Sequence, residues 1–278
     1  MRIKFWGVRG STPAPQPENM RYGGNTSCVE VRLGDNLYIF DCGTGFRVLG
    51  QALRHEFNGR PVSAHIFVSH FHWDHIQGIP FFGPLYDNRE NRFQFHSSSR
   101  TRSLKRVLEE QMAAPYFPVG LTEMQAHQNF YDLGEGRIQL GDVTLQTMWL
   151  NHPQGCMGFR LETKEGVIVY ATDNEPGDAV FDKNVRKLAA GADVLIYDAQ
   201  YLPEEYERKR GWGHSHWREA INVVTESGAK DLVLFHHDPD HDDATIDQMV
   251  EHARRLVRER NSTLQVEAAR EGATVELP

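Results

Sequence analysis

Cysteine is scarce in this 278-residue sequence, and its three cysteines, Cys28, Cys42 and Cys156, are scattered along the chain. They form no C-x-x-C pair, so a structural zinc site built from cysteine is not expected. Scattered spacing and an odd number are typical of reduced thiols. We therefore expect a cytoplasmic protein.

Long apolar runs are also absent. No stretch reaches eighteen apolar residues, so the sequence predicts no membrane-spanning helix and no membrane partner. The N-terminal sequence MRIKFWGVRGSTP contains neither the apolar core nor the small-residue cleavage site of a secretory signal.

Positive charge is not in excess, since the formal net charge is −8 and the pI is near 6.0. Long nucleic acid is therefore not expected as a partner, because such binding depends on Lys and Arg contacts to phosphates. An anionic substrate stays compatible with the composition, because bound metal ions can reverse the local charge.

The chain contains 40% apolar and 24% charged residues, which is ordinary for a globular protein. Its length suits one large domain, which we place over residues 1–278. Short apolar runs rich in β-branched and aromatic residues alternate with amphipathic stretches, which indicates an α/β (α+β) protein with packed sheets covered by helices. The predicted strands are 2–7, 27–33, 36–41, 65–70, 93–97, 143–150, 157–162, 166–173, 193–199 and 231–237. The predicted helices are 46–56, 101–111, 217–227 and 244–261. The less regular stretch 81–135 is expected to form a lid or a dimer contact.

The most informative motif is SHFHWDHIQG at residues 69–78, which holds His70, His72, Asp74 and His75. Such a cluster could be a polar surface, a catalytic pair with neighbours, or half of a metal site. Residues two apart point the same way from an extended segment, and the next two residues follow at a turn. One short loop can therefore supply ligands to two adjacent ions, and imidazole with carboxylate suits Zn²⁺, Mn²⁺ or Fe.

Further candidate ligands lie just beyond other predicted strands, where catalytic groups often sit. His152 follows one strand and Asp173 another, and the carboxylate of Asp173 could bridge two ions. The adjacent His236 and His237 follow a third apolar run, and either could be a ligand. Together with the motif, these residues make a ligand set of five histidines and two aspartates.

The H-x-H-x-D-H motif and the order of the later ligands resemble the metallo-β-lactamase-fold hydrolases. That resemblance implies an αββα sandwich with two divalent metal ions. Zn²⁺ is the expected metal, and Mn²⁺ and Fe are the alternatives. It also favours His236 over His237. By this resemblance one metal is bound by His70, His72 and His152, the other by Asp74, His75 and His236, and Asp173 bridges them.

Finer features resemble the ribonuclease Z-like phosphodiesterase branch. The sequence IYDAQY is similar to its HEAT box, with Asp198 in place of the glutamate, and GHSHWREA is similar to its HST box, with His214 as the matching histidine. The opening GVRGSTP and GGNTSC resemble its glycine-rich hairpin. The resemblance implies that Asp74, Asp198 and His214 take part in catalysis and that the protein is a homodimer.

One departure from that branch bears on the substrate. Transfer-RNA-processing members carry a long arm between the residues that match His152 and Asp173, and here only twenty residues separate the two. The chain is more similar to compact cyclic-nucleotide phosphodiesterases, including the anti-Pycsar type. We therefore expect a small phosphodiester substrate, a cyclic nucleotide, attacked at phosphorus by metal-bound hydroxide. His214 would protonate the leaving oxygen, with Asp198 orienting its ring.

Two other reactions suit the same ligand set: RNA processing by a ribonuclease Z-like nuclease, and hydrolysis of a carboxyl ester, thioester or lactone. A non-catalytic metal-binding module is disfavoured by the Asp198–His214 pair. Secondary candidates are Asp41 as a loop-bracing residue, Trp73 as a wall for a base, and His216 as a phosphate contact. A basic run that is either a solvated face or a binding surface comprises Arg89, Arg92, Arg100, Arg102, Lys105 and Arg106.

Overall fold

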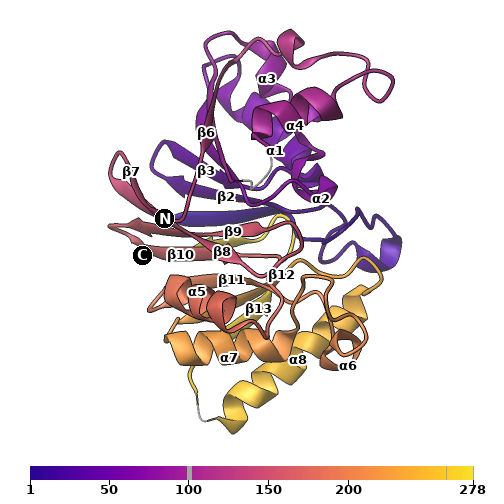
Figure 1. Cartoon of the computed structure of the whole chain (residues 1–278), viewed down its shortest axis with the longest axis vertical. Helices are drawn as coiled ribbons and strands as arrows, with labels where there is room; N and C mark the ends of the chain where they lie inside the picture. The colour runs from indigo at the N-terminus through magenta and orange to yellow at the C-terminus, as the bar shows by residue number, and fades with distance from the viewer. Residues whose placement is uncertain (99–101, 261, 278) are drawn as a thin grey trace.

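A computed structural model describes residues 1–98, 102–260 and 262–277. Two sheets of seven strands each lie face to face, and helices cover the outer face of each sheet (Figure 1). The predicted layering of helices outside two packed sheets is therefore confirmed. Among the described residues, no helix combines the length and the apolar character needed to cross a membrane.

The first sheet has the strand order β14-β1-β2-β3-β4-β5-β6. Its strands β14 to β3 pair antiparallel, whereas β3 to β6 pair parallel. The parallel half brings the carboxyl ends of β3 and β4 to the same edge. The strands are β1 (Arg2–Gly7), β2 (Cys28–Leu33), β3 (Asn36–Phe40), β4 (Ser63–Val68), β5 (Arg92–Ser97), β6 (His127–Asp132) and β14 (Thr274–Glu276).

The second sheet has the order β13-β12-β11-β10-β9-β8-β7. Strands β7 to β10 pair antiparallel, and β10 to β13 pair parallel. The strands are β7 (Gly136–Leu140), β8 (Val143–Leu150), β9 (Cys156–Thr163), β10 (Gly166–Ala171), β11 (Val194–Asp198), β12 (Asp231–Phe235) and β13 (Gln265–Ala268).

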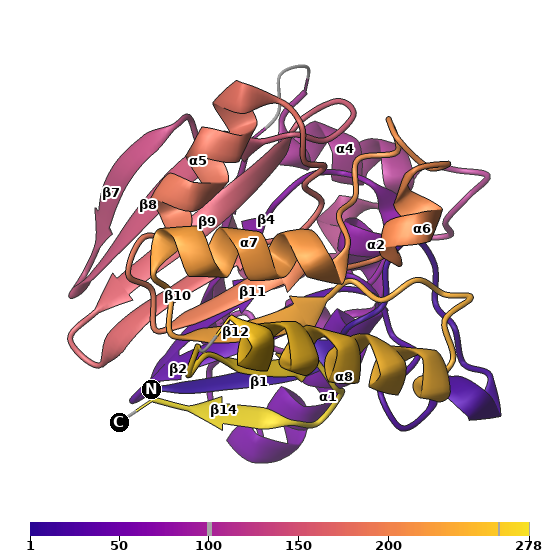
Figure 2. The ribbon, with the colours of Figure 1, turned by 90° about the horizontal axis from the view of Figure 1, so that it is seen from below.

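The helices form the two outer layers. Apolar side chains of α1 and α4 pack on the first sheet, and those of α5, α7 and α8 pack on the second. Figure 2 shows the ribbons of α5, α7 and α8 lying over the second sheet. The α-helices are α1 (Thr44–Phe57), α2 (Trp73–Ile76), α3 (Pro84–Asp87), α4 (Leu104–Gln111), α5 (Ala179–Ala189), α6 (Pro203–Tyr206), α7 (Trp217–Ser227) and α8 (Asp243–Glu259). Short 3-10 turns lie at Pro17–Asn19, Ile79–Phe81 and Leu121–Glu123.

An apolar core fills the space between the sheets and includes stacked aromatic rings from both. The rings of Phe40 and Phe67 in the first sheet lie 5.1 Å apart, and Phe159 of the second sheet lies 5.7 Å from each. All three side chains are buried. This core fixes the two sheets against each other and so fixes the spacing of the loops at their edges.

All ten predicted strands are confirmed, each end within two residues. Helices α1 and α7 were also predicted; α4 and α8 begin and end close to the expected bounds, with Thr101 and Asn261 outside the described residues. Four strands, β6, β7, β13 and β14, were missed, as were helix α5 and the four-residue helices α2, α3 and α6. The stretch 81–135, expected to be irregular, contains β5, β6 and α4.

Candidate metal centre

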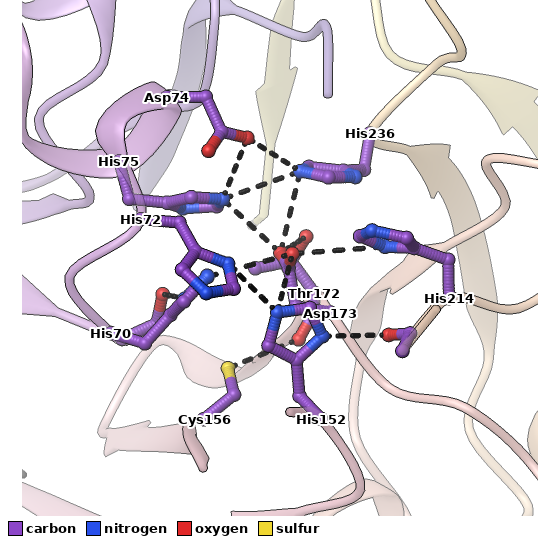
Figure 3. Close-up of polar contacts among 12 residues, drawn as sticks. His70, His72, Asp74, His75, His152, Cys156, Thr172, Asp173, His214 and His236 are labelled. Carbon is purple, nitrogen blue, oxygen red and sulfur yellow. Dashed lines mark hydrogen bonds and ion pairs between the residues drawn. The ribbon is translucent and has the colours of Figure 1, made fainter. Parts of the chain in front are cut away.

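The carboxyl ends of six strands place the predicted site residues along one edge of the sandwich. Strands β10, β11 and β12 run parallel, and β8 shares their direction because both β8 and β10 pair antiparallel with β9. Asp198 is the last residue of β11, and the loops after β8, β10 and β12 carry His152, Asp173 and His236. The loops after β3 and β4 of the other sheet carry Asp41 and the histidine motif. Figure 3 shows the side chains of the histidine motif, His152, Asp173 and His236 converging.

A first group of four donor atoms is formed by Nε2 of His75 and His236 with Oδ2 of Asp74 and Asp173. Nε2 of His75 lies 3.1 Å from Asp74 Oδ2, 3.3 Å from Asp173 Oδ2 and 3.3 Å from His236 Nε2. Nε2 of His236 lies 3.2 Å from Asp74 Oδ2 and 3.4 Å from Asp173 Oδ2. A tetrahedron around Zn²⁺ with bonds of about 2.0–2.1 Å has edges of about 3.3 Å, so these spacings suit one ion.

A second group of donors surrounds the other oxygen of Asp173. Its Oδ1 lies 3.7 Å from His70 Nε2 and 3.8 Å from His152 Nε2, and the latter lies 3.1 Å from His72 Nδ1. Asp173 thus presents a different oxygen to each group, as a bridging carboxylate does. The buried Nε2 of His70 has no hydrogen-bond partner in the described part of the chain. A buried imidazole nitrogen without a partner is costly unless an ion occupies that position, so the residues fit a pair of metal ions.

The buried carboxylate of Asp41 orients the motif from behind. Its Oδ2 accepts hydrogen bonds from His75 Nδ1 at 2.7 Å, from Ser69 Oγ at 2.8 Å and from Tyr170 Oη at 2.8 Å, while Oδ1 accepts the Ser69 N–H at 2.8 Å. An Nδ1–H held by this carboxylate makes Nε2 of His75 the nitrogen that a metal ion in the first donor group would use. Asp41 therefore braces the loop that carries the histidine motif, which is the role expected of it from the sequence.

Two more imidazoles are fixed by their far nitrogens. His152 Nδ1 lies 2.8 Å from the carbonyl oxygen of Gly213, and His236 Nδ1 lies 3.0 Å from Oε1 of Gln200. Both acceptors require an Nδ1–H, which again leaves Nε2 free for the cluster. Gly213 has φ +89, and a Cβ at this position would overlap the ring of His152, so the close contact requires glycine.

Backbone strain is concentrated at the same strand ends. Asp41, Asp173 and His236 have φ angles of 59, 56 and 64 degrees, in the left-handed region that non-glycine residues rarely adopt. Each such residue costs about 1–3 kcal/mol and persists only when its surroundings hold it. Of the six non-glycine residues with positive φ in the described part of the chain, these three belong to the cluster or to its direct support, which marks this edge as functional.

Burial and mutual charge set the protonation of the cluster. Burial lowers the pKa of His152 to about 4 and that of His70 well below its usual range. Burial alone would raise the pKa of Asp173, but the imidazoles of His236 and His75 outweigh it and hold that pKa well below the usual range. Burial alone would lower the pKa of His75 and that of His236, but the carboxylates of Asp74 and Asp173 outweigh it and raise both. A metal ion would therefore displace protons from these two rings, because only neutral imidazole binds a divalent metal.

His214 and Asp198 form a pair beside the donor groups. His214 Nδ1 lies 3.0 Å from Asp198 Oδ2, so the aspartate reaches the ring although it is one methylene shorter than glutamate. Asp198 is fully buried, and its oxygens also accept the backbone N–H groups of Asp173, Gln200 and Ser215 at 3.0, 3.1 and 2.9 Å. Asp198 thus fixes the position of the His214 ring relative to Asp173, because it is hydrogen-bonded to both residues.

An open cleft of about 400 Å³ leads to the cluster. Trp73 is 78% exposed on its wall, and His214 reaches the cleft although the Asp198 behind it does not. The residues that line it are Ser11, Phe71, His72, Trp73, Asp74, Asp173 and His214.

Several candidates lie elsewhere. His237 is buried with its Nε2 2.9 Å from the carbonyl oxygen of Ala269, outside the cluster, so the structure brings His236 rather than His237 to the site. His216 caps helix α7 by accepting the Glu219 N–H at 3.1 Å, and it does not line the cleft.

The basic run is largely a solvated face. Arg102 and Arg106 form ion pairs with Glu110, and Arg89 lies 3.4 Å from the Gln125 side chain. Arg100 lies outside the described residues.

Sequence reasoning missed Ser11, Gln200 and Tyr170 as parts of the site. Ser11 and Gln200 lie in the two segments that resemble the glycine-rich hairpin and the HEAT box, which was the available signal. Tyr170 gave no signal, because a tyrosine inside an apolar strand looks like an ordinary core residue.

The model of the beta-lactamase superfamily domain matches residues 36–237, which is more than half of the chain. The ribonuclease Z of Haloarcula marismortui is 26% identical over 295 aligned residues that cover 91% of each protein. The metallo-beta-lactamase fold protein YhfI of Bacillus subtilis superposes with a TM-score of 0.70 at 17% identity, over 99% of this chain and 98% of its own. A diphosphatase from the PhnP family gives a TM-score of 0.70 at 18% identity, over 100% and 98% of the two chains. The predicted metallo-β-lactamase fold is confirmed.

Proposed function

Because the chain belongs to the beta-lactamase superfamily domain family, whose fold usually binds a dinuclear metal site and performs hydrolysis, we propose that it is a phosphodiesterase acting on a small phosphodiester, a cyclic nucleotide. The observation that carries the proposal is the position of His214. Its Nδ1 lies 3.7 Å from Asp173 Oδ1 but is held by Asp198 Oδ2 at 3.0 Å, and the ring lines the cleft. Hydrolysis of such a phosphodiester needs a proton donor, because the sugar oxygen is a poor leaving group unless it is protonated.

Two divalent ions are proposed as the cofactor, with His70, His72 and His152 holding one and Asp74, His75 and His236 the other. Asp173 would offer one oxygen to each. Imidazole-rich sets of about four donors favour Zn²⁺, while Mn²⁺ and Fe suit similar sets. When bound, such ions supply an activated water and neutralise charge on phosphoryl oxygens.

His214 is proposed as the general acid. Its Nδ1–H is held by Asp198, so Nε2 is the ring nitrogen that remains for the cleft. A proton on Nε2 would pass to the departing oxygen, and the buried carboxylate would stabilise the charged ring before that transfer. Asp198 does not line the cleft and acts by positioning His214.

The size of the substrate is argued from two features. The interval from His152 to Asp173 consists of the β9–β10 hairpin and four flanking residues, and the hairpin turn is only two residues long, so the interval contains no projecting arm. The cleft of about 400 Å³ lies at the small end of ligand pockets, and the exposed ring of Trp73 offers a surface for a base. Both favour a mononucleotide over a folded RNA.

A nuclease that processes RNA is the second candidate. It is favoured by the likeness to the ribonuclease Z of Haloarcula marismortui, which extends over 91% of both proteins. Against it stand the net charge of −8 and the pairing of Arg102 and Arg106 with Glu110 in the basic run.

A hydrolysis panel with purified, Zn²⁺- or Mn²⁺-supplemented protein tests the proposal. It includes cyclic mononucleotides, cyclic dinucleotides, bis-p-nitrophenyl phosphate, a precursor tRNA and a lactone. We expect the fastest turnover with a cyclic mononucleotide. Specific removal of a tRNA 3′ trailer at a higher rate would establish the second candidate instead, and cleavage of the lactone alone would reject both.

The role of His214 has a separate test. His214→Ala should lower turnover of a cyclic nucleotide about 10²–10⁴-fold and that of bis-p-nitrophenyl phosphate far less, because nitrophenolate departs without a proton. His216→Asn is the matched control, since asparagine also caps helices and His216 lies outside the cleft. Equal losses with both substrates, or loss of a metal ion, would contradict the general-acid role.

The remaining parts of the proposal concern the number of domains, the oligomeric state and the cellular location. We propose one domain, because β1 and β14 from the two ends of the chain pair in one sheet. A homodimer is supported by the exposed Phe81 and Tyr116 in the stretch 81–135, and light scattering tests it. A cytoplasmic location is supported by the three free, buried cysteines.

A further inference from the structure

The turn at Gly10–Thr12 is strained and stands at the cleft. Ser11 has φ +61, and the N–H of Thr12 donates to the carbonyl oxygen of Gly10 at 2.6 Å. A hydrogen bond between residues two apart around a residue of positive φ defines the rarer and more strained kind of γ-turn. Glycine adopts such a φ without steric cost, so a serine at this position is the less stable choice.

The surrounding structure holds this turn in place. The Gly10 N–H donates to the His237 carbonyl at 3.0 Å, and the Ser11 N–H donates to Asp74 Oδ2 at 2.8 Å. The preceding Arg9 is fully buried, and its guanidinium donates only to backbone carbonyls among the described residues. These carbonyls belong to Gly23, Asp238, His241 and Asn19, at 2.8, 3.0, 2.6 and 3.3 Å. Strain that is held so firmly marks a functional position.

The side chain of Ser11 gains nothing from burial, because it is exposed and lines the cleft with Asp74 and His214. Its Oγ lies 3.3 Å from Nε2 of Gln200, which can only donate. A hydroxyl has one donor and two acceptor positions. Since Gln200 occupies an acceptor position, the O–H of Ser11 is left to donate toward the cleft.

We propose that Ser11 is a substrate-contacting residue, whose hydroxyl donates a hydrogen bond to a non-bridging phosphoryl oxygen. The inference rests on the proposed function and assigns a contact that the metal ligands and His214 do not supply. Its backbone N–H is bonded to Asp74, so the hydroxyl stands next to the first donor group. Glycine at position 11 would remove the backbone strain, yet the chain has serine there. The hydroxyl is the polar group that this serine presents to the cleft.

Two substitutions separate the hydroxyl from the backbone. Ser11→Gly removes the hydroxyl and relieves the turn, whereas Ser11→Ala removes the hydroxyl and keeps the strain. Both should lower kcat/KM for bis-p-nitrophenyl phosphate and weaken binding of a nucleoside 5′-monophosphate by about 10- to 100-fold, as expected when a hydrogen bond to a charged group is lost. The melting temperature of Ser11→Gly should equal or exceed that of the parent, and both should retain the parent's metal content.

Thr12→Ala is the matched control, because it removes an exposed hydroxyl from the same turn outside the cleft lining, and it should stay within about two-fold of the parent. If the parent cleaves phosphodiesters and both Ser11 variants match it, the Ser11 contact is wrong and the function stands. If the parent binds the monophosphate without cleaving any phosphodiester and the variants bind it more weakly, the function is wrong and the contact stands. A parent that neither cleaves nor binds overturns both.

Discussion

Replacing Asp41 by asparagine should change the tautomer of a metal-facing histidine. The buried carboxylate accepts hydrogen bonds from Ser69, Tyr170 and His75, the last at 2.7 Å from Nδ1. In Asp41→Asn one oxygen still accepts the Ser69 N–H, and the amide nitrogen takes the place of Oδ2. An amide N–H cannot face an imidazole N–H, so His75 must accept at Nδ1 and carry its proton on Nε2.

The consequence reaches the first donor group directly, because Nε2 is the atom of His75 that lies within 3.1–3.3 Å of Asp74 and Asp173. A protonated nitrogen cannot bind a metal ion. Loss of an outer partner of this kind lowers metal affinity about 10- to 100-fold, equal to about 1.4–2.8 kcal/mol. Losing the charge-assisted bonds of Asp41 should also lower the free energy of unfolding by about 1.5–3 kcal/mol.

Zn²⁺ titration against a chromophoric chelator measures the affinity, and urea unfolding of the metal-free protein measures the stability. Tyr170→Phe is the matched control, since it removes one donor to the same carboxylate at 2.8 Å but leaves the proton of His75 on Nδ1. It should destabilise the fold and preserve metal affinity. The reasoning is refuted if Asp41→Asn binds two ions as tightly as the parent, or if Tyr170→Phe loses as much affinity.

Three further substitutions test other parts of the structure. Asp173→Ala should release at least one ion in metal analysis and abolish most activity, because it removes the shared carboxylate; full metal content would contradict the bridge. Gly213→Ala should lower the melting temperature and activity together, since its Cβ would overlap His152 at φ +89; unchanged activity would contradict the contact. Burial lowers the pKa of His96 to about 4, whereas in the unfolded chain the pKa of this side chain is about 6.5. As the pH drops from about 6.5 toward 4, the unfolded state therefore binds a proton that the folded state does not, and the free energy of unfolding falls. His96→Phe should flatten that dependence in urea unfolding, and an unchanged slope would reject it.

Much of the fold was predictable because its central strands carry a local signal. β10, β11 and β12 consist mainly of continuous apolar runs, as expected of strands buried on both faces. The missed strands lack that signal: β6 is HQNFYD and mostly exposed, and β14 is three residues long. Such edge strands form because the adjacent strand of the sheet supplies backbone hydrogen-bond partners, and this pairing leaves no pattern in the sequence of the edge strand itself. Helix α5 was missed because its first turn exposes Val180 and weakens the apolar period.

The sequence by itself determined the chemical content of the site. Three histidines and an aspartate in six positions, with His152, Asp173 and a histidine after β12 at strand ends, are local facts of spacing. They define a metal-ligand set before any fold is known, because ligand type and strand-end position follow from residue identity and apolar runs.

Only the tertiary structure decided which atoms meet. The backbone leaves β12 at His236, where φ is 64 degrees, and the fold directs His236 into the cluster and His237 to the Ala269 carbonyl. The parallel pairing of β3 and β4 placed Asp41 behind His75, and the packing of the two sheets brought Tyr170 to the same carboxylate. The approach of Ser11 to Asp74 joins residues 63 positions apart. Contacts of this kind depend on how distant segments pack, and spacing along the chain does not encode them.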